Sequence, residues 1–118
     1  MTKRILVIED EQLITKTLKK LLTKAGYAVT IAQSGQEAIE IIKANDFDLI
    51  ITDLKMPGMS GFELSAYVRN RNKFNKHTPI LLLTTENISK EEARQNGCIA
   101  YFSKSDKQRL LSMVRIIV

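Results

Sequence analysis

Three carboxylates follow short apolar runs in this chain. Glu9 and Asp10 come directly after residues 5–8, and Asp53 follows residues 47–52. Runs this short and this apolar predict strands buried on both faces of a parallel sheet, and the carboxyl ends of such strands open on one edge. Acids gathered there raise one another's pKa, and a bound divalent cation would relieve their repulsion. Oxygen ligands without nearby cysteine or histidine favour Mg²⁺, with Mn²⁺ as a second choice, over Zn²⁺.

A hydroxyl and an ammonium group follow two further apolar runs. Thr84 lies near the end of residues 79–85, and Lys104 follows residues 99–103. Beside the acids, they form a set suited to phosphoryl transfer: a carboxylate can attack phosphorus, while a cation and a hydroxyl stabilise the phosphoryl oxygens. The plainer interpretation is that the acids are solvated or cap helices, the threonine is an ordinary strand residue and the lysine is solvated.

The loop after Asp53 has a defined turn signal. Pro57 and Gly58 suit the second and third positions of a type II turn, and residues 54–61 connect them to the next helix. Such a turn would hold the chain close to Asp53, so that the backbone carbonyl of Lys55 could face a metal.

Five strands alternate with five helices in the predicted secondary structure. Strands are expected at residues 5–8, 27–32, 47–52, 79–85 and 99–103, with 27–32 and 99–103 nearer the sheet edges. Helices are expected at residues 13–25, 36–44 and 62–70, from Asn87 or Ser89 to 96, and from Ser105 or Asp106 to 117. Ser34 and Glu37 form a predicted capping box, and residues 70–77 a polar, basic loop. Such alternation predicts an α/β fold with a parallel sheet covered on both faces.

These motifs resemble the receiver domain of two-component response regulators, in the CheY-like superfamily. The resemblance is carried by Val-Ile-Glu-Asp-Glu at residues 7–11, Asp-Leu-Lys-Met-Pro-Gly-Met-Ser-Gly at residues 53–61, Thr84 and Lys104, and it covers nearly the whole chain. It implies a (βα)5 fold: a doubly wound five-stranded parallel sheet in the order 2-1-3-4-5, with helices on both faces.

The resemblance also assigns roles to the acids. Asp53 would accept a phosphoryl group from a histidine kinase or a histidine phosphotransfer protein. Asp10 would hold Mg²⁺ directly and Glu9 through water, and the carboxylate of Asp53 and the backbone carbonyl of Lys55 would complete the protein ligands.

The remaining roles concern the response to phosphorylation. By the same resemblance, Lys104 would pair with a phosphoryl oxygen, Thr84 would be the switch hydroxyl and Tyr101 the aromatic switch residue. The surface of the fourth helix, fifth strand and fifth helix would change, for a downstream protein, an output domain or a homodimer. The chain would then be a phosphoacceptor that assists its own Mg²⁺-dependent phosphorylation and dephosphorylation, and not an enzyme.

The sequence departs from the family pattern at several positions. Glu9 stands where aspartate is more usual, and Thr85 is bulkier than the common residue. Ser105 replaces a proline that usually follows a cis peptide bond; without proline a cis bond costs about 2.5–4 kcal/mol, which favours trans and leaves the placement of Lys104 open. Lys55 and Glu86 have opposite charges, and we hypothesise that they bridge the mouth of the site.

Three other functions compete with the phosphorylated switch as interpretations of these residues. A degenerate receiver serving as a constitutive protein-interaction module is favoured by the missing proline and opposed by the retained acids, Thr84 and Lys104. An aspartyl-phosphate phosphatase usually has an acid two positions after its nucleophile, where this chain has Lys55. Dinucleotide binding is excluded because no Gly-x-Gly-x-x-Gly follows the first strand.

Length, charge and composition limit the remaining classes of function. The 118 residues predict a single domain over 1–118, and the net charge is +5. The lysines of the first helix predict a solvated face or an acidic partner, and without a recognition helix or interleaved aromatics we expect no direct nucleic-acid binding. No apolar run could span a bilayer, no signal peptide is evident and the single cysteine is Cys98, so we expect a cytoplasmic protein without membrane contact. Whether the chain stands alone or belongs to a longer regulator or hybrid kinase stays open, as do its kinase and its output.

Overall fold

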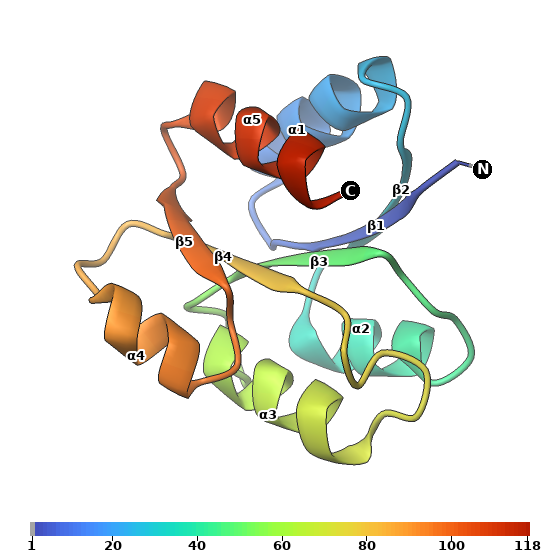
Figure 1. Ribbon diagram of the computed structural model, residues 1–118, viewed down its shortest axis with the longest axis vertical. Helices are drawn as coiled ribbons and strands as arrows, with labels where there is room; N and C mark the ends of the chain where they lie inside the picture. Colours follow the sequence, from blue (N-terminus) through green and yellow to red (C-terminus); the bar gives the residue numbers. More distant parts are fainter. Residues whose placement is uncertain (1) are drawn as a thin grey trace.

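The computed structural model describes residues 2–118, in which strands and helices alternate along the chain (Figure 1). The strands are β1 (Arg4–Ile8), β2 (Ala28–Ala32), β3 (Leu49–Asp53), β4 (Ile80–Thr84) and β5 (Ala100–Ser103). The helices are α1 (Gln12–Lys24), α2 (Gly35–Ile42), α3 (Gly61–Arg71), α4 (Lys90–Gln95) and α5 (Lys107–Ile117). All neighbouring strands pair in parallel in the order β2-β1-β3-β4-β5, which confirms the predicted fold and strand order.

The sheet separates two apolar cores, because successive strand side chains point to opposite faces. Ile5 and Val7 of β1 face α1 and α5, whereas Leu6 and Ile8 face α2, α3 and α4. Figure 1 shows these two helical layers on opposite sides of the sheet. The three central strands are almost entirely buried, and β2 is partly exposed, as expected for an edge strand.

Side chains at the helix starts settle the alternatives that the sequence left open. Ser89 caps α4 by accepting a hydrogen bond from the Glu92 backbone N–H, and Asp106 caps α5. Ser34 caps α2 as predicted, but the Glu37 carboxylate accepts from the backbone N–H of Gln33 instead of completing a capping box.

The C-terminal end of α4 is fastened to α3. The hydroxyl of Ser65 donates to the carbonyl of Asn96 at 2.6 Å, and the guanidinium of Arg69 donates to the carbonyl of Gly97 at 2.8 Å and to two carbonyls of the α3–β4 loop. Gly97 has a φ of +82°, and a Cβ there would lie 2.8 Å from the Ser65 hydroxyl. Among residues 2–118, no hydrogen bond joins residues 87–92 to another helix or strand.

Buried asparagines organise the edge of the sheet opposite the acids. Asn75 is fully buried; its amide oxygen accepts from the Phe47 backbone N–H at 2.8 Å, and its amide nitrogen donates to the Asn45 carbonyl and the Asn72 side chain. The hydroxyl of Thr78 donates to the same asparagine. The loop predicted at residues 70–77 begins later, because residues 70 and 71 still belong to α3. Two of its asparagines are interior groups: Asn75 joins the loop to the segment before β3, and Asn72 joins it to the end of α2.

Within the described residues, no helix has both the length and the apolar character needed to cross a bilayer.

Candidate functional site

Strand register brings the predicted side chains to one edge of the sheet. Ile8 pairs with Thr52, Asp53 with Leu83, and Thr84 with Ser103, so β1, β3, β4 and β5 end at nearly the same level. Glu9 and Asp10 therefore follow β1 directly beside Asp53, and each of these three acids has a carboxylate oxygen within 4.8 Å of those of the other two. The predicted convergence of the acids is confirmed.

The three acids differ in their exposure to solvent. Glu9 is fully buried, Asp53 is nearly so, and Asp10 is exposed. The Oε1 atom of Glu9 accepts hydrogen bonds from the Glu11 backbone N–H and from Lys104 Nζ, both at 3.2 Å. Its buried Oε2 atom accepts no hydrogen bond within the described residues and has only an ion-pair contact, with Lys104 Nζ at 3.1 Å. A buried carboxylate oxygen that accepts no hydrogen bond and lies among other acids is a suitable ligand for a hard divalent cation.

Lys104 supplies the positive charge of the site. Its Nζ lies 2.9 Å from Asp53 Oδ2, 3.1 Å from Glu9 Oε2 and 3.2 Å from Glu11 Oε1, and its side chain is 12% exposed. The described residues contain no cis peptide bond, so the bond between Lys104 and Ser105 is trans. The lysine thus reaches the acids without the cis proline whose absence left its placement open.

Burial and the neighbouring charges shift two pKa values in this site. Burial, aided by the charge of Asp53, raises the pKa of Glu9 to about 7, against the opposing effects of the Glu11 backbone N–H and Lys104. Burial alone would lower the pKa of Lys104, but hydrogen bonds and charges from Asp53 and Glu9 outweigh it and raise that pKa. The ammonium therefore stays charged, and the acids share one counterion.

The loop after β3 orients the carboxylate of Asp53. The backbone N–H of Lys55 donates to Asp53 Oδ1 at 3.3 Å, so both oxygens of Asp53 have hydrogen-bond donors. Gly58 has a φ of +80°, as position three of a type II turn requires. At Gly61 a Cβ would lie 2.5 Å from the Asp53 carbonyl oxygen, so only glycine permits this close return of the chain.

Thr84 and Tyr101 lie on neighbouring strands without a direct hydrogen bond between them in the described part of the chain. The hydroxyl oxygen of Thr84 accepts from the Glu86 backbone N–H at 2.9 Å. Tyr101 is half-buried against the core that faces α2, α3 and α4, and it lines a groove between α4 and α5.

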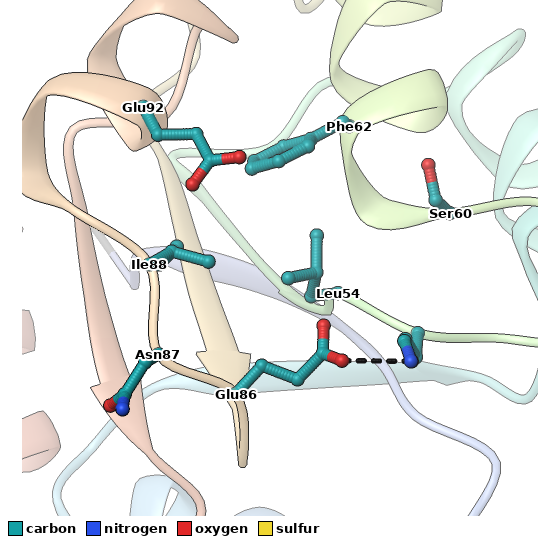
Figure 2. A pocket seen from close by; sticks show the side chains of 8 residues that line it. Leu54, Ser60, Phe62, Glu86, Asn87, Ile88 and Glu92 are labelled. Atoms are coloured by element: carbon teal, nitrogen blue, oxygen red, sulfur yellow. Dashed lines mark ion pairs between the residues drawn. The ribbon is translucent and has the colours of Figure 1, made fainter.

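The hypothesised bridge at the mouth of the site is present. Lys55 Nζ lies 2.7 Å from Glu86 Oε1, and the two side chains are 77% and 40% exposed. This contact raises the pKa of Lys55. Figure 2 shows the bridge at one end of a cavity of about 570 Å³, which is lined by Leu54, Phe62 and Ile88 among others.

Two residues of the site received no role from the sequence. Glu11 is the third acid to contact Lys104, and Gly61 permits the loop to close over Asp53. Glu11 stands next to the predicted acid pair, and Gly61 ends the motif that begins at Asp53. Their positions were visible in the sequence, but the contacts that define their roles are not local.

Curated proteins with similar sequences include two that differ in size. "Probable transcriptional regulator ycf29" of Pyropia yezoensis is 31% identical over 121 residues, covering all of this chain and 54% of its own length. "Polar-differentiation response regulator DivK" of Brucella ovis is 32% identical over 106 residues, covering 88% of this chain and 85% of its own length. The chain thus spans about half of the first relative and most of the second.

Solved structures match the fold over essentially its whole length. The chemotaxis protein CheY4 of Vibrio cholerae is 33% identical with a TM-score of 0.90, covering 100% of both chains. The response regulator TrrA of Thermotoga maritima is 33% identical with a TM-score of 0.86, covering 99% of this chain and 100% of its own. A family model described as "Response regulator receiver domain" matches residues 5–115. With the acid cluster, the fold and this match in agreement, the chain belongs to the receiver domain family of response regulators, which are signalling domains.

Proposed function

We propose that residues 1–118 form one receiver domain that acts as a phosphoryl-accepting switch, with Asp53 as the acceptor. A carboxylate oxygen of Asp53 attacks the phosphorus of a phosphohistidine on a histidine kinase or phosphotransfer protein. An O–P bond forms, the N–P bond breaks, and the imidazole leaves with the electron pair. The observation that carries this proposal is the ammonium of Lys104, held 2.9 Å from Asp53 Oδ2 where phosphoryl charge would arrive.

The acid cluster fits a divalent cation. Asp10 and Asp53, with Glu9 and the backbone carbonyl of Lys55, would hold Mg²⁺ or Mn²⁺, and the buried Oε2 of Glu9, which accepts no hydrogen bond, supports this assignment. When bound, the cation would neutralise charge on the incoming phosphoryl group. The solved structure of TrrA from Thermotoga maritima is described as a complex with Mg²⁺ and BeF, which supports the same chemistry here.

The other side chains of the site would stabilise and report the phosphorylated state. Lys104 pairs with one phosphoryl oxygen. The Thr84 oxygen already accepts a hydrogen bond from the Glu86 backbone, so its O–H proton is available to donate to another phosphoryl oxygen. Movement of Thr84 would change the exposure of Tyr101 and the surface formed by α4, β5 and α5, where a downstream protein, an output domain or a second copy would bind. We place this exchange in the cytoplasm, where the single free cysteine stays reduced.

Mass spectrometry after incubation with acetyl phosphate and MgCl₂ tests the acceptor. We expect the chain to gain one phosphoryl mass, and Asp53→Asn to abolish that gain because an amide oxygen is a poor nucleophile. Asp46→Asn, which changes an exposed acid at the opposite edge of the sheet, should leave the gain intact. An undiminished mass shift in Asp53→Asn would remove Asp53 from the acceptor role.

A constitutive protein-interaction module is the second candidate. Lys104 already pairs with Glu9, Glu11 and Asp53, so the acids have a counterion without a phosphoryl group or a metal. The absence of any mass shift with acetyl phosphate, phosphoramidate and carbamoyl phosphate would favour this candidate.

The bridge between Lys55 and Glu86 should lengthen the life of the phosphorylated state by hindering the attacking water. Lys55→Ala should therefore speed dephosphorylation, by no more than about fivefold because an exposed ion pair is worth about 0–1 kcal/mol. The half-life of the phosphorylated chain after removal of the phosphodonor measures this effect. Lys43→Ala breaks another exposed ion pair, with Glu40 on α2, and serves as the control. Equal half-lives for wild type and Lys55→Ala would contradict the bridge's role.

A further inference from the structure

The loop between α3 and β4 has an inward side and an outward side. Every third residue is buried, and these are Asn72, Asn75 and Thr78, which hydrogen-bond to one another and to residues 42–47. The residues between them, and the one before them, are exposed: Arg71, Lys73, Phe74, Lys76 and His77. The buried network fixes the backbone of the loop, so the outward side chains start from fixed positions on the surface.

Phe74 is the one exposed aromatic side chain among residues 2–118. It is 56% exposed and belongs to neither apolar core. Asn72 and Asn75 on either side of it are held inside, which directs the Phe74 ring towards solvent. Apolar surface in water is stabilised when another surface covers it. The ring is therefore available for an apolar contact outside the protein.

Cations surround this ring along the chain. Within the part of the chain that the structure describes, no ion pair is formed by Arg71, Lys73 or Lys76. The acids of the adjoining α2–β3 loop are already engaged: Asp46 pairs with the Arg4 guanidinium at 3.4 Å, and Asp48 accepts from the Arg4 backbone N–H at 2.8 Å. We call the set of three cations and Phe74 the basic loop face.

The two edges of the sheet differ in charge. The acids of the site follow the strands, whereas the basic loop face precedes β4, and Figure 1 shows the α3–β4 loop on the side where β3 and β4 begin. Lys3 and Lys24 add exposed cations to that side, because Lys3 precedes β1 and Lys24 ends α1 shortly before β2. A negatively charged surface would therefore attract this edge of the sheet and repel the edge that carries the acids.

We propose that the basic loop face binds the surface of an anionic membrane. The cations would pair with lipid phosphates, and the Phe74 ring would enter the boundary between headgroups and acyl chains. A surface contact needs no spanning helix, so this inference revises the sequence-based expectation of a protein without membrane contact. It does not rest on the proposed function, although it would leave the acids facing away from the membrane, towards soluble partners.

A bilayer suits this face better than a peptide or a nucleic-acid strand does. Peptides and strands bind in grooves, and none of the cavities described in residues 2–118 is lined by a member of the basic loop face. A bilayer needs no groove, because it contacts whatever projects from the protein. Each cation near an anionic bilayer is worth about fivefold in affinity, so we expect weak, reversible binding with half-saturation on the order of a few millimolar lipid.

Tryptophan fluorescence tests the proposal on the unphosphorylated full chain. The chain contains no tryptophan, so Phe74→Trp introduces its single indole, at an exposed position. Vesicles of phosphatidylcholine with about one third phosphatidylglycerol should shift the emission to shorter wavelength at low ionic strength, because the indole leaves water. Vesicles of phosphatidylcholine alone should leave the emission unchanged. Leu13→Trp is the matched probe: Leu13 is 77% exposed at the start of α1, near the acids, so its emission should not respond to either vesicle.

Charge reversals in the Phe74→Trp background test the role of the cations. Lys73→Glu combined with Lys76→Glu should raise the lipid concentration at half-saturation by at least about twentyfold. Lys19→Glu combined with Lys20→Glu makes the same change of net charge on the exposed face of α1 and should raise it by less than about threefold. All four lysines are exposed, so both double variants should fold.

Several results would overturn the proposal. One is the absence of any emission shift at about 10 mM lipid, and another is an equal shift for the two tryptophan probes. Equal weakening by the two pairs of lysine substitutions would show attraction by net charge alone. A larger shift with a single-stranded oligonucleotide at the same phosphate concentration, or with poly-glutamate at the same charge concentration, would assign the basic loop face to a different partner.

Discussion

Replacing Lys104 with methionine should lower the free energy of unfolding of the metal-free protein by about 3 kcal/mol, because removing one partner of a buried ion pair leaves the other charge uncompensated. Lys104 contacts Glu9, Glu11 and Asp53 and is 12% exposed. Methionine has a similar length and fills the same space without the charge. Urea unfolding in the presence of a chelator measures the loss.

Addition of MgCl₂ should recover much of that stability, because the acids would then share a different cation. Wild-type protein should gain less from the same addition, since its ammonium already neutralises them. Lys20→Met, on the exposed face of α1, is the control and should change the free energy of unfolding by no more than about 0.5 kcal/mol. Equal stabilisation of wild type and Lys104→Met by MgCl₂ would argue against a shared counterion role.

The second large effect is expected at the opposite edge of the sheet. Asn75→Ala should destabilise the protein by about 3 kcal/mol or more, because each buried polar group left without a partner costs about 1–3 kcal/mol. The substitution removes the acceptor of the Phe47 N–H and the donor to the Asn45 carbonyl, and it leaves the Asn72 side-chain oxygen with one hydrogen-bond donor instead of two.

Chemical denaturation measures this loss, and Asn70→Ala provides the comparison. Asn70 is exposed on α3, and its replacement should cost no more than about 0.5 kcal/mol. Because Asn75 lies away from the acids, the phosphoryl gain from acetyl phosphate should persist in whatever fraction of Asn75→Ala stays folded. A stability equal to that of Asn70→Ala would mean that the buried amide network contributes little.

The sheet was predictable from sequence because buried parallel strands are short apolar runs, but the exact starts of two strands depended on hydrogen bonds made outside the sheet. The third strand was expected from residue 47, yet β3 begins at Leu49 because the Phe47 N–H bonds to the Asn75 side chain. The second strand was expected from residue 27, yet β2 begins at Ala28, because the Tyr27 N–H bonds to the Leu22 carbonyl at the C-terminal end of α1. The first bond has no signal in the local sequence, whereas the second belongs to the C-terminal cap of α1, which Gly26 with a φ of +101° permits.

The site was predictable in its members and less so in its contacts. The location of Glu9, Asp10 and Asp53 at the ends of predicted strands was enough to predict that they lie together, because the carboxyl ends of parallel strands meet at one edge of the sheet. The placement of Lys104 depended on the conformation of the β5–α5 loop, where the missing proline removed the usual guide. Its partners lie 51 to 95 residues away in sequence, a range over which spacing carries no information.

The unequal fastening of α4 gives that helix the mechanics of a lever. Ser65 and Arg69 hold its C-terminal end at Gly97 and form a fulcrum, while the end near Thr84 has no comparable tie in the described hydrogen bonds. In a rotation about a fixed point, displacement grows with distance from that point. A pull at Thr84 would therefore move Lys90, at the start of α4, further than Arg94, near its end.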